Sequence, residues 1–362
     1  MALRVTLIPG DGVGPEVVDA SRRAVEATGV DVSWEEHPLG AEAFARTGRV
    51  LPAETLASIR SNRVALKGPI ETPASAEVRN ANVTLRRELD LYANVRPCRH
   101  YPGVPSLYEG LDLLVVRENT EDTYTGIEFE VGTPEVAQLI RFVEASTGVR
   151  IREDSGVSVK SISEGRSERI VRFAFEEARR RGRRAVTAAH KANIMKLSDG
   201  LFLSVARRVA QQYPDVAFDD RIIDALCMQL VTAPERFDVL VLPNLYGDIV
   251  AELGAGLVGG SAVAPGAHIG DGLAVFEPTH GTAPRLAGAD RADPVGAMLS
   301  AAMLLRHLGE REAGDRLEAA IAGVLADGID VTDDLRAPGD DRPGVGTSRM
   351  AEAVCERLTA PR

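Results

Sequence analysis

The sequence contains little cysteine, few aromatic residues and a shortage of positive charge. Its three cysteines, Cys98, Cys227 and Cys355, form no Cys-x-x-Cys pair, which argues against a disulfide framework or a thiolate zinc site and indicates a reducing compartment. Aromatic residues make up only 4% of the chain, so a surface that stacks nucleic-acid bases is not expected. Acidic residues outnumber basic residues by 53 to 42, the opposite of the balance typical of nucleic-acid-binding proteins.

Long apolar runs are also absent. No stretch approaches the ~18 apolar residues that cross a membrane. The opening sequence MALRVTLIPGDG lacks the long apolar core of a signal peptide, so a cytoplasmic location is expected. With 362 residues, of which 44% are hydrophobic and 26% charged, the chain is long enough for two folded domains.

Short apolar segments alternate with amphipathic segments, which predicts an α/β fold. Strands are predicted at residues 4–8, 64–66, 113–116, 185–188, 217–223 and 239–242, and their apolar character suits strands covered on both faces. Helices are predicted at 163–181, 293–308 and 311–326. Residues 129–161 show short alternating β signals instead and predict an arm that leaves the sheet. Residues 333–346, rich in Pro, Gly and Asp, predict a surface loop before a last helix.

The glycine-rich loop after the first strand does not match a dinucleotide-binding fingerprint. Its glycines, Gly10, Gly12 and Gly14, precede a helix, but the third comes one residue too early for G-x-G-x-x-G. A Rossmann domain is therefore not expected. A tight strand-to-helix turn without ligand-binding function explains the loop equally well.

Three arginines, Arg86, Arg96 and Arg117, stand beside predicted strands. Arginine binds carboxylates through two parallel N–H bonds, so the three together would suit a di- or tricarboxylate. Each alone would be explained by a structural ion pair.

Acidic residues gather after two other strands. Asp248 and Glu252 are four residues apart, so they share one face of a predicted helix, and Asp224 follows another strand. Oxygen ligands of this kind suit Mg²⁺ or Mn²⁺ rather than zinc. A solvated acidic helix face is the alternative.

Two further residues are candidates for proton transfer. Lys191 lies in a loop of small residues with few neighbouring charges, where a lysine can lose its proton and act as a base. Tyr124 offers a phenol as an acid. His190 is expected to be structural, because no other histidine has ligand spacing, and the arginines of 179–184 are expected to form a solvated helix end.

Six motifs in order resemble the isocitrate/isopropylmalate dehydrogenase family of metal-dependent β-decarboxylating dehydrogenases, and most resemble its isocitrate dehydrogenases. They are IPGDGVGPE, NVTLRRELDLYANVRP, VVRENTEDTYTGIE, HKANIMKLSDGLF, NLYGDIVAEL and FEPTHGTAPRLAG. The resemblance implies two α/β domains around a cleft, without a Rossmann domain. Residues 1–98 and 250–362 would form the large, cofactor-side domain. Residues 99–249 would form the small domain, whose excursion near 130–160 clasps a second subunit.

The resemblance also assigns roles to individual residues. It implies that Tyr124 and Lys191 are the catalytic pair and that Asp224, Asp248 and Glu252 hold Mg²⁺ or Mn²⁺. Lys191 and Asp224 would come from the neighbouring subunit of a homodimer or larger homo-oligomer. The substrate-binding residues would be Asn80, Asn82, Arg86, Arg96 and Arg117. The cofactor-binding residues would be Thr72, His280, Gly281, Ala283, Arg285 and Asp293.

The chain departs from the family pattern at Asn80, where isocitrate dehydrogenases have Ser, at Glu252, where Asp is usual, and at Arg285. We expect oxidative decarboxylation of isocitrate to 2-oxoglutarate.

The alternative substrates are homoisocitrate, phosphonomethylmalate and isopropylmalate. Isopropylmalate is less favoured, because Asn80 and Asn82 make the pocket polar. Arg285 can bind a 2′-phosphate and favours NADP over NAD, although Asp293 and Asp333 would repel that phosphate. A non-catalytic regulatory subunit is disfavoured, since the catalytic side chains are present.

Overall fold

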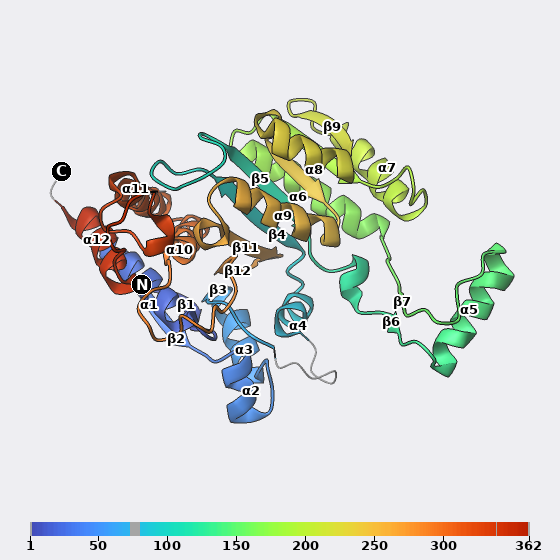
Figure 1. Cartoon of the computed structure of the whole chain (residues 1–362), viewed down its shortest axis with the longest axis horizontal. Coiled ribbons are helices and arrows are strands. Elements are labelled where there is room, and N and C mark those ends of the chain that lie inside the picture. The colour runs from blue at the N-terminus through green and yellow to red at the C-terminus, as the bar shows by residue number, and fades with distance from the viewer. Residues whose placement is uncertain (1, 73–79, 338, 361–362) are drawn as a thin grey trace.

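Ten strands form one mixed sheet in the computed structural model, which describes residues 2–72, 80–337 and 339–360 (Figure 1). Their order across the sheet is β2-β1-β3-β12-β11-β4-β5-β10-β8-β9. The strands are β1 Leu3–Ile8, β2 Val32–Glu36, β3 Val64–Lys67, β4 Ala93–Arg99, β5 Asp112–Glu118, β8 Ala185–His190, β9 Ala217–Ile222, β10 Val239–Leu242, β11 Pro265–Gly270 and β12 Leu273–Pro278.

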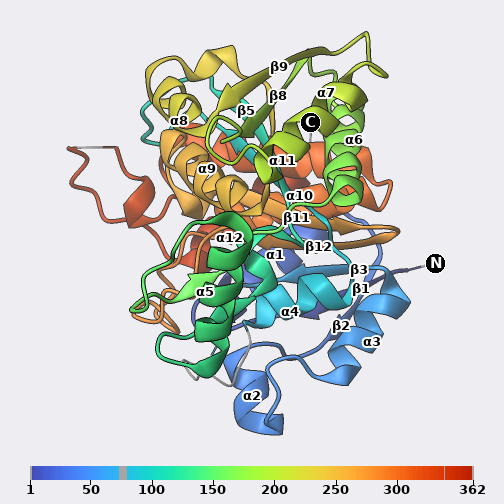
Figure 2. The same ribbon diagram turned by 90° about the vertical axis from the view of Figure 1, so that its right-hand side faces the viewer.

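Helices cover both faces of this sheet (Figure 2). They are α1 Gly14–Ala27, α2 Ala41–Thr47, α3 Ala53–Asn62, α4 Ala81–Glu88, α5 Pro134–Thr147, α6 Glu164–Arg180, α7 Ser198–Ala210, α8 Ile223–Thr232, α9 Asn244–Leu257, α10 Val295–His307, α11 Arg311–Asp327 and α12 Thr347–Thr359. None of the helices in the described residues combines the length and apolar character needed to span a membrane.

The six predicted strands and three predicted helices are present, with ends that differ by a few residues. The strand predicted at 217–223 ends at Ile222, because Ile223 already begins α8. Four strands were not predicted: β2, β4, β11 and β12. Two of them, β4 and β11, contain charged or small residues and pair antiparallel in the middle of the sheet, where the apolar pattern is weakest.

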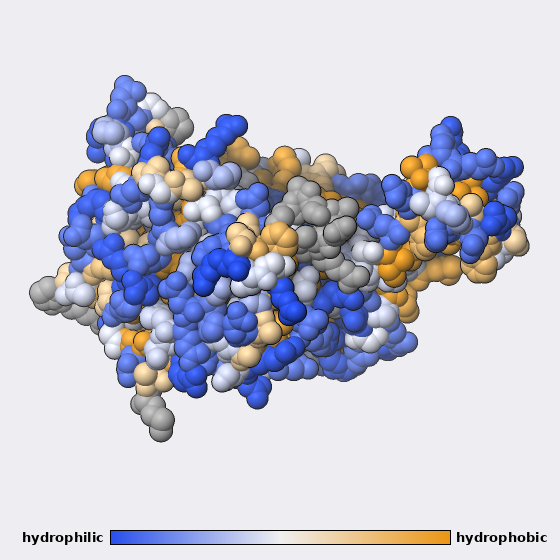
Figure 3. Space-filling view, turned by 90° about the horizontal axis from the view of Figure 1, so that it is seen from below, coloured by the Kyte–Doolittle hydropathy of each residue, from blue (hydrophilic) through white to orange (hydrophobic). Residues whose placement is uncertain are grey.

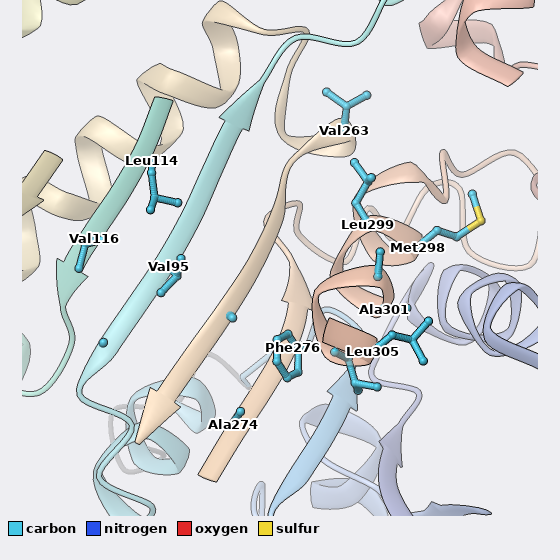
Figure 4. Close-up of a cluster of buried hydrophobic side chains, with 14 of the residues drawn as sticks. Val95, Leu114, Val116, Val263, Ala274, Phe276, Met298, Leu299, Ala301 and Leu305 are labelled. Atoms are coloured by element: carbon cyan, nitrogen blue, oxygen red, sulfur yellow. The ribbon is translucent and has the colours of Figure 1, made fainter. Parts of the chain in front are cut away.

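The alternation of side chains along each strand produces two cores. Leu114 and Val116 of β5 pack with residues of α6 and α10, whereas Leu113 and Val115 belong to a separate cluster with α8 and α9. Figure 4 shows the first core, where side chains from β4, β5 and β12 face the apolar side of α10. The sheet is therefore buried on both faces, as the apolar strands predicted.

The arm is present, but its centre is helical. Residues 134–147 form α5, and only the two-residue strands β6 Glu128–Phe129 and β7 Val157–Ser158 pair beside it. The prediction of β structure over this region was wrong. Thr133 caps the helix by accepting a hydrogen bond from the Val136 N–H, Pro134 suits the first turn, and Gly148 ends the helix with φ +73°. In Figure 1 the arm projects from the rest of the molecule.

The two predicted domain boundaries fall at different places in the secondary structure. The boundary at 98 falls near the end of β4, and the boundary at 249 falls inside α9. The division into a large and a small domain stays a prediction.

The glycine-rich loop contacts two backbone segments. The Asp11 N–H donates to the Pro69 carbonyl at 2.8 Å, and the Val13 N–H donates to the Thr282 carbonyl at 2.9 Å. Gly12 has φ +63°, and a Cβ at this position would overlap the Thr282 carbonyl. The loop therefore needs glycine so that residues 68–72 and 280–288 can approach it closely.

We expect Gly12→Ala to lower the free energy of unfolding by about 3 kcal/mol, because it combines a left-handed backbone with a steric overlap. Gly29→Ala is the matched control, since Gly29 has φ +83° but no atom within 4 Å of a Cβ. The control should lose only about 1 kcal/mol. Urea denaturation of both variants measures the difference, and equal losses would contradict the close approach of Thr282.

Candidate active site

Strand alternation gathers charged side chains on one face of the sheet. Leu66 of β3 lies opposite Phe276 of β12 in a parallel pair, so the next residues, Lys67 and Glu277, are neighbours. Leu66 and Phe276 point into the first core, and Lys67 and Glu277 therefore point to the other face. The same alternation directs charged or polar residues of the three adjoining strands to this face.

Glu277 is the centre of a buried ion network, which we call the Glu277 network: Lys67, Arg86, Arg96, His268 and Glu277. Lys67 is 1% exposed and Glu277 is 5% exposed, and the Lys67 Nζ and Glu277 Oε2 form an ion pair. The guanidinium groups of Arg86 and Arg96 lie 4.0 and 3.9 Å from Glu277 Oε1. Despite burial, the charges of Lys67 and its neighbours hold the pKa of Glu277 well below its ordinary value.

His268 is neutral in this network. Asn119 donates through Nδ2 to the Leu91 carbonyl at 2.9 Å, which fixes its amide orientation, and the same nitrogen lies 3.0 Å from His268 Nδ1. His268 Nδ1 must therefore accept, and Nε2–H donates to Glu277. Burial, followed by the charge of Arg86, lowers the pKa of His268 to about 3.

The three predicted arginines come together here. Burial lowers the pKa of Arg86 to about 10. The positive charges of Arg117 and Arg96 lower it further, whereas the negative charge of Glu277 raises it. Arg96 is held by Asn94 Oδ1 at 2.9 Å and Thr279 Oγ1 at 2.6 Å. Three buried cations that repel each other favour the binding of an anion.

Arg117 joins these cations to the predicted proton donor. Its Nε donates to Asn244 Oδ1 at 2.9 Å, and its Nη1 pairs with one oxygen of Asp248. The Tyr124 hydroxyl donates to the other oxygen of Asp248, and the Arg117 guanidinium lies 4.9 Å from the Tyr124 ring centroid. Arg117 Nη2 is buried and has no hydrogen-bond partner within residues 2–72, 80–337 and 339–360. Gly247 allows this arrangement, since a Cβ there would overlap the Arg117 side chain.

Tyr124 keeps its proton at neutral pH. Partial burial raises its pKa, and the hydrogen bond to Asp248 raises it further, because both disfavour the phenolate. A protonated phenol beside an anion-binding cluster can act as a general acid.

The predicted metal ligands are divided. Asp248 and Glu252 lie one turn apart on α9, but Asp224, which is in the first turn of α8, is 67% exposed and paired with Lys191. Among the described residues, no group of three or more His, Cys, Asp or Glu is arranged to hold a metal ion. Partial burial and the charge of Asp248 raise the pKa of Glu252. A divalent cation would relieve that repulsion, so the two carboxylates fit one if a third ligand comes from elsewhere.

The sequence predicts few charges beside Lys191, but in the structure it has a charged partner. Its Nζ pairs with Asp224, because β8 and β9 are adjacent parallel strands and both residues follow their ends. Within the part of the chain that the structure describes, Lys191 forms no hydrogen bond or ion pair with Tyr124 or Asp248. His190 is structural, as predicted: Nδ1 accepts from the Ala192 N–H at 3.0 Å and Nε2 lies 3.2 Å from Asp220.

The predicted cofactor residues flank the glycine-rich loop. Thr72 accepts a hydrogen bond from the Ala81 N–H at 3.0 Å, at the start of α4. His280 Nδ1 lies 2.9 Å from the Gly281 carbonyl, whereas Gly281, Ala283 and Arg285 are exposed. Asp293 is buried, accepts from the Val295 N–H at 2.8 Å, and has a pKa raised well above its ordinary value by that burial.

Asn80 and Asn82 lie at the start of α4. Asn80 is exposed, and its Oδ1 caps the helix by accepting from the Val83 N–H at 3.1 Å. Capping therefore occupies the oxygen of Asn80 and leaves only its N–H groups for a ligand. Asn82 is half-buried.

Comparison with known proteins decides the family. Residues 4–354 match the family model described as isocitrate/isopropylmalate dehydrogenase. The chain belongs to the isocitrate/isopropylmalate dehydrogenase family. This family consists of decarboxylating dehydrogenases that act on a hydroxyl group and depend on a divalent metal and on NAD or NADP, so the chain is an enzyme of that class.

Relatives with different substrates and cofactors resemble the chain to a similar degree. It is 43% identical to a probable NAD isocitrate dehydrogenase subunit alpha of Caenorhabditis elegans (98% of this chain, 92% of that protein). It is 44% identical to the NADP isocitrate dehydrogenase of Thermus thermophilus (98% and 67%). It is 43% identical to the chloroplastic 3-isopropylmalate dehydrogenase of Solanum tuberosum (90% and 86%).

A solved structure confirms the predicted fold class. The crystal structure of isocitrate dehydrogenase from Methylococcus capsulatus has a TM-score of 0.90 to this chain at 45% identity. The match includes 99% of the present chain and 100% of the Methylococcus capsulatus chain.

Sequence reasoning missed the buried residues beneath the arginines: Lys67, Asn119, His268 and Glu277. A signal was available for two of them, because Lys67 ends an otherwise apolar strand and Glu277 lies in the family motif FEPTHGTAPRLAG. A charge at the end of a buried strand needs a partner. His268 and Asn119 gave no such signal, since only the pairing of β11 with β12 brings His268 to Glu277, and Asn119 reaches His268 from the end of β5.

A large hollow lies away from these residues. It has a volume of about 1400 Å³ and lies between α6 and α10, with Val95, Ala267 and Phe276 among its lining residues. Its charged lining residues are largely paired with each other, for example Arg183 with Asp112 and Asp238, and Arg180 and Arg181 with Glu177. It contains none of the family residues assigned above, and the run of arginines at 179–184 has structural partners there.

We expect the stability of the protein to fall between pH 6.5 and pH 5 because of His268. Its folded-state pKa of about 3 lies below the unfolded value of 6.5, so its contribution is full above pH 6.5 and declines as the unfolded chain gains a proton. The slope from one such group is about 1.4 kcal/mol per pH unit. His268→Gln should remove that slope in urea denaturation measured at pH 7 and pH 5.

The control for this prediction is His37→Gln, which changes a half-buried histidine outside the Glu277 network. It should keep the wild-type slope. An unchanged slope in His268→Gln would show that His268 titrates normally in the folded chain.

Proposed function

We propose that the chain catalyses the NAD(P)-dependent oxidative decarboxylation of isocitrate to 2-oxoglutarate with Mg²⁺ or Mn²⁺. The observation that carries this proposal is the group of three buried arginines, Arg86, Arg96 and Arg117, beside a protonated Tyr124. A tricarboxylate would neutralise their repulsion and would supply a partner for the free Nη2 of Arg117. The names of several relatives that are 40–44% identical agree with this substrate.

The metal would be held by Asp248 and Glu252 of one chain and by Asp224 of a second copy. When bound, such a cation would stabilise negative charge on the substrate's hydroxyl oxygen as the carbon that carries it is oxidised, and this is worth several kcal/mol. The chain's own contribution is to fix Asp248 between Arg117 and Tyr124, so that this carboxylate is oriented before the ligands arrive.

Proton transfer would use Lys191 of the second copy and Tyr124. Lys191 would remove the proton from the substrate hydroxyl, while the nicotinamide accepts the hydride. After CO₂ is lost, Tyr124 would donate its proton to the β-carbon, and Asp248 beside it would hold the hydroxyl in place.

A second copy of the chain is the partner proposed for this site. The arm exposes Ile127, Val131, Phe142 and Val149. Figure 3 shows apolar surface on the projecting part of the molecule. Further large apolar residues are exposed after Lys191 and on α8 and α9: Ile194, Leu197, Met228, Val231 and Ile249. Exposed apolar groups of this kind are typical of protein–protein interfaces.

The residues near the adenosine loop favour NADP over NAD. Arg285 is exposed and can bind a 2′-phosphate through two N–H groups. Asp293 and Asp333 were expected to repel this phosphate, but both repel it less than free carboxylates would. Burial raises the pKa of Asp293 well above its ordinary value, and Asp333 pairs with Arg291 at 2.8 Å.

A second candidate substrate is another 3-substituted malate with an acidic arm, such as homoisocitrate or phosphonomethylmalate. Asn80 favours it, because its exposed N–H groups can bind an anionic arm longer than that of isocitrate. Isopropylmalate is less favoured, since its apolar arm would leave these N–H groups unpaired, although one relative is a 3-isopropylmalate dehydrogenase.

Activity with a panel of substrates tests the proposal. Isocitrate should turn over with Mg²⁺ or Mn²⁺, faster with NADP than with NAD, and EDTA should abolish turnover until Mn²⁺ is restored. Asp248→Asn should lower kcat by about 100-fold or more. Full activity in EDTA would exclude the metal-dependent reaction, and a preference for homoisocitrate or phosphonomethylmalate would favour the second candidate.

Heterodimers test whether two chains share each site. Tyr124→Phe and Lys191→Met chains with different tags are co-expressed, and the mixed dimer is isolated. If Tyr124 and Lys191 of different chains meet, the mixed dimer has one complete site and should recover about half of the wild-type activity. If both residues of a site come from one chain, the mixed dimer should be as inactive as its parents.

A further inference from the structure

A second buried ion cluster lies away from the Glu277 network. We call it the Lys160 cluster, and it consists of Asp122, Lys160, Asp199 and Tyr246. Lys160 Nζ is 2.9 Å from Asp199 Oδ1 and 3.9 Å from Asp122 Oδ1, and both aspartates are fully buried. The same nitrogen lies 4.2 Å from the centroid of the Tyr246 ring.

Asp199 holds the residue proposed as the base. It lies in the first turn of α7, and its Oδ2 accepts a hydrogen bond from the backbone N–H of Lys191 at 2.7 Å. The loop between them is closed by the Met195 N–H, which donates to the Lys191 carbonyl at 2.9 Å. The position of the Lys191 backbone therefore depends on the position of the Asp199 carboxylate.

Asp122 holds the residue proposed as the acid. It begins the short 3₁₀ helix Asp122–Thr125 that contains Tyr124, and its own backbone is left-handed, with φ +70°. Its Oδ1 accepts from the Thr123 N–H at 2.8 Å, and its Oδ2 accepts from the Leu245 N–H at 3.1 Å. One carboxylate therefore ties the turn of Tyr124 to the start of α9.

Among the described residues, Lys160 is the one cation in contact with both carboxylates. Without it, two fully buried negative charges would face each other, and each would be costly to retain. The chain has only four lysines among its 42 basic residues. A compact ammonium suits this position between two carboxylates and an aromatic ring, whereas a planar guanidinium would need more space.

We propose that Lys160 is a positioning residue that fixes Lys191 through Asp199 and Tyr124 through Asp122. This inference rests on the proposed function, in which the Lys191 and Tyr124 of one chain serve different active sites. In that arrangement the Lys160 cluster is a direct physical connection between the two active sites of a dimer.

The proposal predicts an effect on kcat rather than on KM. Lys160 contacts Asp122, Asp199 and Tyr246 and not the three arginines, so substrate binding should be retained. Lys160→Met should lower kcat by about 10- to 100-fold, the effect of misplacing a reacting group by about 1 Å, with KM for isocitrate changed by less than about threefold. Lys160→Arg should recover part of kcat, since it keeps the charge.

Lys196→Met is the matched control, because Lys196 is an exposed lysine in the loop that follows Lys191. It should leave kcat within about twofold of the wild type. If Lys160→Met does not fold, Asp199→Asn serves instead, as it removes the ion pair while keeping the size of the side chain and one acceptor.

The heterodimer described above separates the two links. Its complete site uses Lys191 from the Tyr124→Phe chain and Tyr124 from the Lys191→Met chain. Adding Lys160→Met to the first chain therefore disturbs only the Lys191 of that site, and adding it to the second chain disturbs only its Tyr124. We expect kcat to fall in both cases.

Unchanged activity in both mixed dimers would overturn the proposal, and a fall in only one would exclude the connection between sites. A failure of the proposed function is distinct, since the wild-type enzyme would then not oxidise isocitrate at all.

Discussion

The buried carboxylate of Glu277 is the interaction on which the site depends. Four basic side chains surround it, and three of them, Lys67, Arg86 and Arg96, would repel each other without a negative charge between them. Removing one member of a buried ion network leaves the others unpaired, which commonly costs 3–5 kcal/mol. Glu277 offsets only one of these three positive charges, so the network keeps a positive charge that is available to an anion from solution.

The network also explains why the site lies on the sheet and not on a glycine-rich loop. A Rossmann loop binds phosphate through its own N–H groups at a helix N-terminus. Here Asp11 and Val13 donate their N–H groups to the carbonyls of Pro69 and Thr282, so the loop organises neighbouring segments instead. The chemistry moves to side chains of the central strands, whose positions are fixed by the pairing of the sheet.

The division of the site is the second organising feature. Tyr124, Asp248 and the arginines form one group, while Lys191 and Asp224 form another, and the ion pairs Arg117–Asp248 and Lys191–Asp224 each lie inside one group. Under the proposed function, each group finds its partner on a second copy. The Lys160 cluster lies between the two groups, and it gives the chain a rigid, fully buried connection at the point where a shared active site would need one.

The sequence by itself determined the family, the α/β class and six strands of the sheet, because these depend on local patterns and on motifs with fixed spacing. Only the tertiary structure decided the rest. The arm is helical because Thr133, Pro134 and Gly148 define the two ends of a helix, in which Val136 and Ile140 are buried one turn apart. Asn80 proved to be a helix cap, because its oxygen has a neighbouring N–H to accept. The Glu277 network and the Lys160 cluster join residues up to 210 positions apart, as with Lys67 and Glu277. Strand order and helix packing alone bring such residues together, and no local pattern in a sequence records which buried charges will meet.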